Sequence, residues 1–367
     1  MMIDLEALYK LPYVTGQLPG VGGRLRATPE HFVVEEVALY VPEDAGKHLY
    51  VNLTKVGLTT KEVQRSLERL FGLRAGEVGY AGLKDKHART TQTFSICVEQ
   101  FNQEAVERAP DRIADELPVT VNWARRHTNK LRPGHLLGNR FTITVTECPY
   151  PAAEIMQRAL WIGQALQQTG ALNFFGPQRF GIAGANVIRG YELLTGQRRE
   201  RDKWLRRFLL SSYQSYLCNC YLTRRFEMGA FAHLLPGDVA KKTDTGGLFN
   251  VVDPIAETER YVTHAISFTA PLFGSKMWAA QDEAGRLEES VLAQAGVTLS
   301  DFQRVGIEGS RRVGRLLLGN LQTSVTAEGL CLTFFLPKGA FATTILREFM
   351  KVDLADTPDL DGLDGEG

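Results

Sequence analysis

The stretch Gly82-Leu83-Lys84-Asp85-Lys86-His87-Ala88-Arg89-Thr90-Thr91-Gln92 surrounds one carboxylate with basic side chains. Its glycine and charged residues predict a loop, and the alternation of Phe94, Ile96 and Val98 predicts a strand after it. Nearby positive charge favours the ionised form of Asp85. An ionised aspartate on a short loop has the chemistry of a nucleophile or a general base, and the cations suit phosphate. The alternative is an exposed loop whose aspartate balances its neighbours.

Further strands and helices are expected on both sides of this loop. Alternating or β-branched residues predict strands at 32–40, 47–53, 141–147 and 331–336. Thr59 and Glu62 have the spacing of a capping box that opens a helix. Apolar periodicity predicts helices over about 153–169, 204–226 and 341–351. Because strands and helices follow no regular βαβ order, the pattern favours an α+β fold.

The composition is that of a globular protein. The chain has 367 residues, 44% of them apolar and 23% charged, which indicates two domains or one domain with a large insertion. Five scattered cysteines without a CxxC pair predict neither a disulfide framework nor a zinc site. No apolar run is long enough for a membrane span, and Met1 to Glu6 lacks the features of a signal peptide. We therefore expect a cytoplasmic protein, without a nucleotide cofactor because no phosphate-binding glycine loop occurs.

The formal net charge of zero conceals an uneven distribution. Residues 352–367 contain six acidic and no basic residues, and we expect this tail to be disordered. The rest of the chain carries a net charge of +6, with basic clusters at 125–140 and 198–207. Such clusters suit phosphate contacts, although each alone is also compatible with a solvated surface.

The Gly82–Gln92 stretch closely resembles the signature of the TruD-type tRNA pseudouridine synthases. Four further motifs resemble those of the family in the same order: Pro29–Glu36 (PEHFVVEE), Lys130–Phe141 (KLRPGHLLGNRF), Asn173–Gly181 (NFFGPQRFG) and Leu336–Thr343 (LPKGAFAT). His31 stands where the family usually has Asp, and Phe174 where it has Tyr. The resemblance covers the chain from about residue 20 to 350.

The resemblance implies an enzyme that isomerises uridine to pseudouridine in RNA without a cofactor or metal. The family's usual target is uridine 13 in the D-arm of tRNA. The resemblance identifies Asp85 as the nucleophile, attacking C1′ or assisting deprotonation at C2′, and Arg26 as its expected partner. The other expected substrate-binding residues are Phe32, Asn139, Phe341, Lys84, Gln92, Phe141, Gln178 and Arg179.

The resemblance also implies a domain organisation. A catalytic domain with a mixed, mainly antiparallel sheet is expected at 1–169 and 316–351, interrupted by an α/β insertion (TRUD) domain at 170–315. Two other functions remain open. One is a non-catalytic RNA-binding or tRNA-folding protein. The other is a nucleoside hydrolase, which would need a second carboxylate near Asp85, with Glu36 as the candidate.

Overall fold

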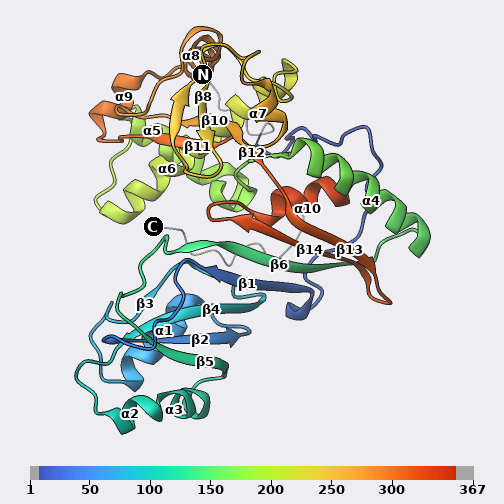
Figure 1. Ribbon diagram of the computed structural model, residues 1–367. Helices are drawn as coiled ribbons and strands as arrows, with labels where there is room; N and C mark the ends of the chain where they lie inside the picture. Colours follow the sequence, from blue (N-terminus) through green and yellow to red (C-terminus); the bar gives the residue numbers. More distant parts are fainter. Residues whose placement is uncertain (1–7, 353–367) are drawn as a thin grey trace. The chain divides into compact units, whose positions relative to one another are not determined.

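An eight-stranded sheet carries the loop that contains Asp85 (Figure 1). The computed structural model describes residues 8–352. The acidic tail, except Val352, and the residues Met1 to Glu6 lie outside the described residues, so the predictions made for them are not tested. Within the described part, the chain forms two compact units. We call residues 21–160 and 319–339 the sheet unit, and residues 8–20, 161–318 and 340–352 the helix unit.

The sheet of the sheet unit has the order β13-β14-β6-β1-β4-β2-β5, with β3 paired to β4. β1 and β4 run parallel, whereas the other neighbouring strands pair antiparallel. The mixed, mainly antiparallel sheet predicted from the sequence is confirmed. The strands are β1 (Phe32–Ala38), β2 (His48–Lys55), β3 (Gly79–Tyr80), β4 (Arg89–Cys97), β5 (Val119–His127), β6 (Leu136–Thr146), β13 (Gly319–Val325) and β14 (Gly329–Pro337).

One face of this sheet packs against helices. Leu49, Val51 and Leu53 alternate along β2 and form a core with Val63 and Leu67 of α1 (Thr60–Leu70). The short helices α2 (Gln103–Glu107) and α3 (Ala109–Glu116) complete this layer. The predicted capping box is present, since Thr59 accepts the Glu62 N–H and the Glu62 carboxylate accepts the Thr59 N–H. It fixes the start of α1, whose first residue, Thr60, accepts a hydrogen bond from the Asp85 loop.

The helix unit is built around one long helix, α6 (Lys203–Glu227), and a four-stranded sheet of order β11-β10-β8-β9. A second, two-stranded sheet pairs β7 with β12. Helix α4 (Ala152–Thr169) contains the boundary between the units at Leu160/Trp161. The remaining elements are β7 (Ala171–Leu172), the 3-10 helices η3 (Pro177–Phe180) and η4 (Ile182–Gly184), α5 (Ala185–Leu194), β8 (Val239–Lys242), β9 (Leu248–Asn250), α7 (Thr258–Val262), β10 (Ile266–Leu272), α8 (Asp282–Ala295), α9 (Leu299–Arg304), β11 (Ser310–Val313), β12 (Arg315–Leu316) and α10 (Ala342–Met350).

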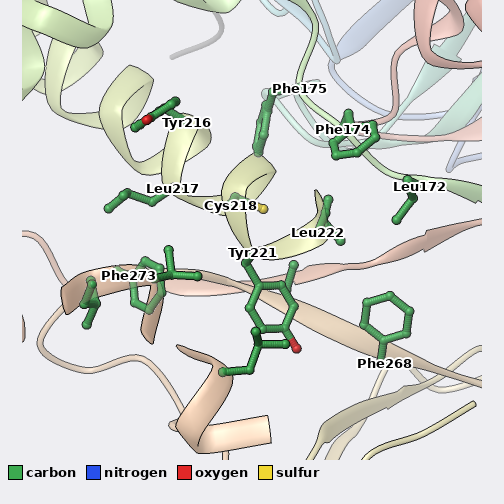
Figure 2. Close-up of a cluster of buried hydrophobic side chains, with 14 of the residues drawn as sticks. Leu172, Phe174, Phe175, Tyr216, Leu217, Cys218, Tyr221, Leu222, Phe268 and Phe273 are labelled. Carbon is green, nitrogen blue, oxygen red and sulfur yellow. The ribbon is translucent and has the colours of Figure 1, made fainter. Parts of the chain in front are cut away.

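The core of the helix unit gathers around α6 (Figure 2). Figure 2 shows Cys218 and Tyr221 of α6 among aromatic side chains that include Phe268 and Phe175. Burial raises the pKa of the Cys218 thiol to about 12, which keeps it protonated. Cys218 is therefore a residue of the hydrophobic core.

Helix α10 belongs to the helix unit by its hydrogen bonds. Arg347 donates to the carbonyl of Pro12, and the Glu348 carboxylate accepts the N–H groups of Val14 and Thr15. Thr344 donates to the carbonyl of Phe174. Residues 8–20 and 340–352 therefore cluster with 161–318 through contacts across more than 300 positions of the sequence. The catalytic domain expected at 1–169 and 316–351 and the insertion expected at 170–315 stay predictions.

No helix within residues 8–352 is both long enough and apolar enough to cross a membrane.

Candidate active site

Both oxygens of the Asp85 carboxylate accept hydrogen bonds. Arg26 Nη2 lies 2.5 Å from Oδ2, and the backbone N–H of His87 donates to Oδ1 over 3.1 Å. The side chains of Arg26 and Asp85 are 5% and 8% exposed. The pairing expected for Arg26 is therefore present. Arg26 adopts a positive φ of 59°, a conformation uncommon for residues other than glycine, in the segment that brings its side chain to Asp85.

The backbone of the loop is fixed through Thr60 and Gln92. Thr60 Oγ1 accepts the N–H of Lys84 over 2.9 Å and donates to Gln92 Oε1 over 2.8 Å. The Gln92 Nε2 group then donates to the carbonyl of Gly82. Because Gln92 is fully buried and its amide is engaged at both ends, its contacts in this structure hold the loop in place.

Lys84 forms a buried ion pair with Glu36. The Lys84 ammonium lies 2.8 Å from Glu36 Oε2, and these side chains are 3% and 2% exposed. The N–H of Thr93 donates to the other Glu36 oxygen. Lys86 pairs with Glu62 at 3.5 Å in a more exposed position. Both lysines beside Asp85 therefore pair with glutamates. The cation in direct contact with the Asp85 carboxylate is Arg26.

Lys55 is a second cation behind the loop, and the sequence reasoning did not identify it. Its ammonium donates to the carbonyl oxygens of Asp85, over 3.1 Å, and Leu58, over 2.5 Å. Lys55 is 1% exposed, and burial lowers its pKa to about 8. Strand alternation could have predicted the burial of Lys55, because Leu49, Val51 and Leu53 point inward and Lys55 lies on the same face of the strand.

Aromatic rings extend from Arg26 along this face. The Arg26 guanidinium lies 4.3 Å above the Phe32 ring. Phe32 meets Phe141 edge-on at 6.4 Å, and Phe141 stacks on Phe334 at 5.6 Å. The register explains the contacts, since β1, β6 and β14 are neighbours and Phe141 lies opposite both Val34 and Phe334. Phe334 was not among the residues singled out from the sequence, because its strand resembles any buried strand.

Asn139 lies on the same face, opposite Glu36 of β1 and Leu336 of β14. Its Oδ1 atom is buried and has no hydrogen-bond partner among the described residues. Buried polar atoms without a partner are uncommon in native proteins. Asn139 therefore offers an unused acceptor on the face that carries Phe32 and Phe141.

Three predicted residues belong to the helix unit. Phe341 precedes α10 and lies 6.0 Å from the ring of Phe175, and the guanidinium of Arg312 covers both rings. Arg179 donates to Ser211 on α6. Gln178 is half-buried in η3. The sheet unit thus brings together Asp85, Arg26, Phe32, Lys84, Gln92, Asn139 and Phe141, whereas Phe341, Gln178 and Arg179 are positioned within the helix unit.

This arrangement presents a buried carboxylate in contact with a cationic side chain. One carboxylate is oriented by a guanidinium and a backbone N–H, and aromatic faces and an amide acceptor lie on the adjoining strands. Such groups suit attack on an electrophilic carbon beside a planar base. Glu36, considered as a second catalytic carboxylate, is engaged by Lys84 instead.

Comparisons with known proteins identify the family of this chain. The sequence model of the family described as tRNA pseudouridine synthase D (TruD) matches residues 9–201 and 199–349. The chain is 44% identical over 354 residues to a tRNA pseudouridine synthase D of Thermus thermophilus, covering 95% of this chain and 94% of that protein. It is 43% identical to the protein of the same name from an Anaeromyxobacter species, with 95% and 98% covered.

A solved structure supports the same assignment. The crystal structure of the Methanosarcina mazei protein that was assigned to tRNA pseudouridine synthase D aligns with a TM-score of 0.76 and 25% sequence identity. The alignment covers 96% of this chain and 99% of that one. The α+β fold expected from the sequence is thereby confirmed. The chain belongs to the tRNA pseudouridine synthase D (TruD) family.

Proposed function

We propose that this protein isomerises uridine to pseudouridine in tRNA, at position 13 of the D-arm, with Asp85 as the nucleophile. The observation that carries the proposal is the buried Asp85 carboxylate, oriented by Arg26 and the His87 N–H beside the Phe32 ring. Membership of the TruD family supports the reaction class. tRNA as the substrate implies action in the cytoplasm, and the position of the uridine rests on the family resemblance.

The reaction rearranges bonds within one nucleotide. In one route the Asp85 carboxylate attacks C1′, the N1–C1′ bond breaks and an ester between Asp85 and C1′ forms. In the other, Asp85 takes a proton from C2′, the N1–C1′ bond breaks and a glycal forms. The uracil anion then rotates and C5 bonds to C1′. This step breaks the ester and frees the carboxylate in the first route, and returns the proton to C2′ in the second. Loss of the proton on C5 and protonation of N1 complete the pseudouridine. The substrate is neither oxidised nor reduced overall, so Asp85 and the surrounding residues supply the chemistry without an external reductant or oxidant.

The base must leave its stack before this chemistry can occur. We propose that Phe32 and Phe141 provide aromatic faces for the extruded uracil, and that the unused Asn139 Oδ1 accepts its N3–H. We propose Phe341, in the helix unit, as a further substrate-binding residue. Lys84 and Gln92 act by fixing the loop, whereas Gln178 and Arg179 contact the RNA or hold η3. We assign catalysis to the domain built on the large sheet and the TRUD insertion to the 170–315 region.

Position-specific product analysis tests this proposal. Two tRNA transcripts, one with uridine and one with cytidine at position 13, are incubated with enzyme, and pseudouridine is mapped by carbodiimide labelling and primer extension. The proposal predicts one modified site, at position 13, in the first transcript and none in the second. Modification elsewhere would overturn the assignment of the uridine but keep the reaction. Tight binding of both transcripts without any product would favour a non-catalytic RNA-binding protein.

A further inference from the structure

An exposed tryptophan marks the beginning of α6. Trp204 is 53% exposed, the second residue of the helix, and lies in the basic segment 198–207. Its ring stacks on Phe208, one helical turn further, with an interplanar angle of 3° and 5.5 Å between centroids. Because Phe208 covers one side of the indole and over half of the residue is exposed, the opposite side is presented to solvent.

A residue of η3 also contacts Phe208. The guanidinium of Arg179 lies 5.3 Å from the Phe208 ring centre and donates to Ser211, the next residue on this side of α6. The hydroxyl of Ser212 donates to the carbonyl of Arg179. Trp204 and Phe208 therefore form a stacked pair on α6, and Arg179 contacts Phe208 from η3. A stacked ring that is held in this way loses little conformational freedom when another planar group is added to its free side.

The surroundings of Trp204 are positively charged. Arg199, Arg201, Lys203 and Arg207 are exposed, and within residues 8–352 none of them forms an ion pair. The acidic groups of the segment have other partners. The Asp202 carboxylate caps α6 by accepting the Leu205 N–H, and Glu200 accepts the Asp202 N–H. These cations are consequently available to an anionic partner.

We infer that this surface, which we call the Trp204 platform, binds the RNA substrate away from the reacting nucleotide, stacking an unpaired base on Trp204 and holding flanking phosphates with Arg199, Arg201, Lys203 and Arg207. The inference rests on the proposed function, because that function supplies the RNA. Proteins bind single-stranded nucleic acid without sequence preference by stacking bases on aromatic side chains and by placing basic side chains against the phosphate backbone. A base within a continuous helix has no free face, so the platform selects an unpaired nucleotide.

The chain offers a matched control for the tryptophan. Trp161 on α4 is 46% exposed, close to the 53% of Trp204. The charged side chains of the preceding turns of α4, Glu154 and Arg158, form an ion pair with each other. Trp161 therefore has similar exposure without a surrounding excess of cations. A general effect of removing a surface tryptophan will appear in both Trp204→Ala and Trp161→Ala.

The test measures the Kd of full-length protein for tRNA by filter binding, beside a fully paired RNA of equal length. We expect Trp204→Ala to raise the Kd for tRNA about 5- to 100-fold and to leave the Kd for the duplex unchanged. Trp204→Phe should retain most of the affinity, and Trp161→Ala all of it. Replacing Arg199, Arg201 and Arg207 together by Gln should reduce the slope of log Kd against log salt by about 2 to 3.

Measuring kcat distinguishes a failure of this inference from a failure of the proposed function. At saturating tRNA, Trp204→Ala should keep the kcat of the wild type, because the platform binds and does not react. Unchanged tRNA affinity in Trp204→Ala, or an equal loss for tRNA and duplex, would overturn the platform while leaving the enzyme intact. A loss shared by Trp161→Ala would overturn it as well. Wild-type protein that binds tRNA through Trp204 but forms no pseudouridine would refute the proposed function alone.

Discussion

The guanidinium of Arg26 lies 2.5 Å from the carboxylate of Asp85, and both side chains are almost fully buried, although 59 positions separate them in the sequence. Buried ions need partners, because moving an unpaired charge out of water costs several kcal/mol. The pair therefore gives the buried Asp85 carboxylate a partner of opposite charge beside the Phe32 ring. It also makes the position of the Asp85 carboxylate depend on a residue outside the loop.

Arg26→Ala is expected to damage activity and stability together. It leaves the Asp85 carboxylate buried with one backbone donor, so the free energy of unfolding should fall by about 3 kcal/mol or more. Loss of the orienting cation should lower kcat by at least about 100-fold. Arg26→Lys keeps the charge but loses the planar geometry, and should recover stability better than turnover. Urea unfolding and single-turnover assays measure these effects. Wild-type kcat in Arg26→Ala would show that the pair is not needed for chemistry.

Asn139→Ala should separate activity from stability. Because Asn139 Oδ1 is buried without a partner among the described residues, its removal should leave the free energy of unfolding unchanged or slightly higher. If the oxygen accepts the N3–H of uracil, kcat/KM should fall by about 5- to 150-fold, the effect of 1–3 kcal/mol. A large loss of stability with unaltered kcat/KM would instead make Asn139 a structural residue of β6.

Lys55 should make the free energy of unfolding depend on pH. Burial lowers the pKa of Lys55 from its usual 10.5 to about 8, so the folded protein releases this proton at a lower pH than the unfolded chain. Between pH 8 and 10.5 the unfolded state binds more protons, and the contribution of Lys55 to stability becomes more favourable as the pH rises. Relative to Lys55→Met, the wild type should therefore gain up to about 3 kcal/mol in unfolding free energy across this window.

Comparing wild type with the variant cancels the titration of other groups, such as Tyr50, whose pKa burial raises to about 12. Urea unfolding at several pH values from 7 to 10.5 gives the difference directly. A difference that stays constant with pH would mean that Lys55 titrates alike in the folded and unfolded states.

A buried ion pair in the helix unit should contribute more to stability than an exposed one. Arg225 and Asp238 are fully buried and form two hydrogen bonds of 2.7 Å. Asp238→Asn leaves the Arg225 charge uncompensated, and should lower the unfolding free energy by about 3–5 kcal/mol. The exposed pair between Lys276 and Glu308 is the control, since Glu308→Gln should cost less than about 1 kcal/mol. Equal effects of both variants on urea unfolding would contradict this account.

The sequence predicted the local features of the site better than its long-range contacts. The Asp85 loop, β1, β2 and the helix start at Thr59 follow from local patterns, and the structure has them. Strand β6 begins at Leu136, five residues before the predicted Phe141, because its glycine and arginine resemble a loop until β1 and β14 pair with them. Strand pairing overrides such local preferences.

The partners of buried charges were harder to predict. The lysines beside Asp85 in the sequence suggested direct neutralisation, yet Lys84 is committed to Glu36. The burial of Lys55 was not predicted, because the predicted strand ended at Leu53, two residues before the end of β2. Both contacts depend on the register between strands and on the fold of the loop over α1, which no local pattern specifies.

The most direct test of the central claim is release of tritium from tRNA transcribed with [5-³H]uridine, comparing wild type with Asp85→Asn. Formation of pseudouridine frees the hydrogen on C5, and Asn keeps the size of the side chain while removing the nucleophile. Because a buried negative charge is lost, Asp85→Asn should bind tRNA at least as tightly as the wild type. The account predicts stoichiometric release by the wild type and none by Asp85→Asn at equal occupancy. Equal release by both proteins would show that Asp85 is not the nucleophile.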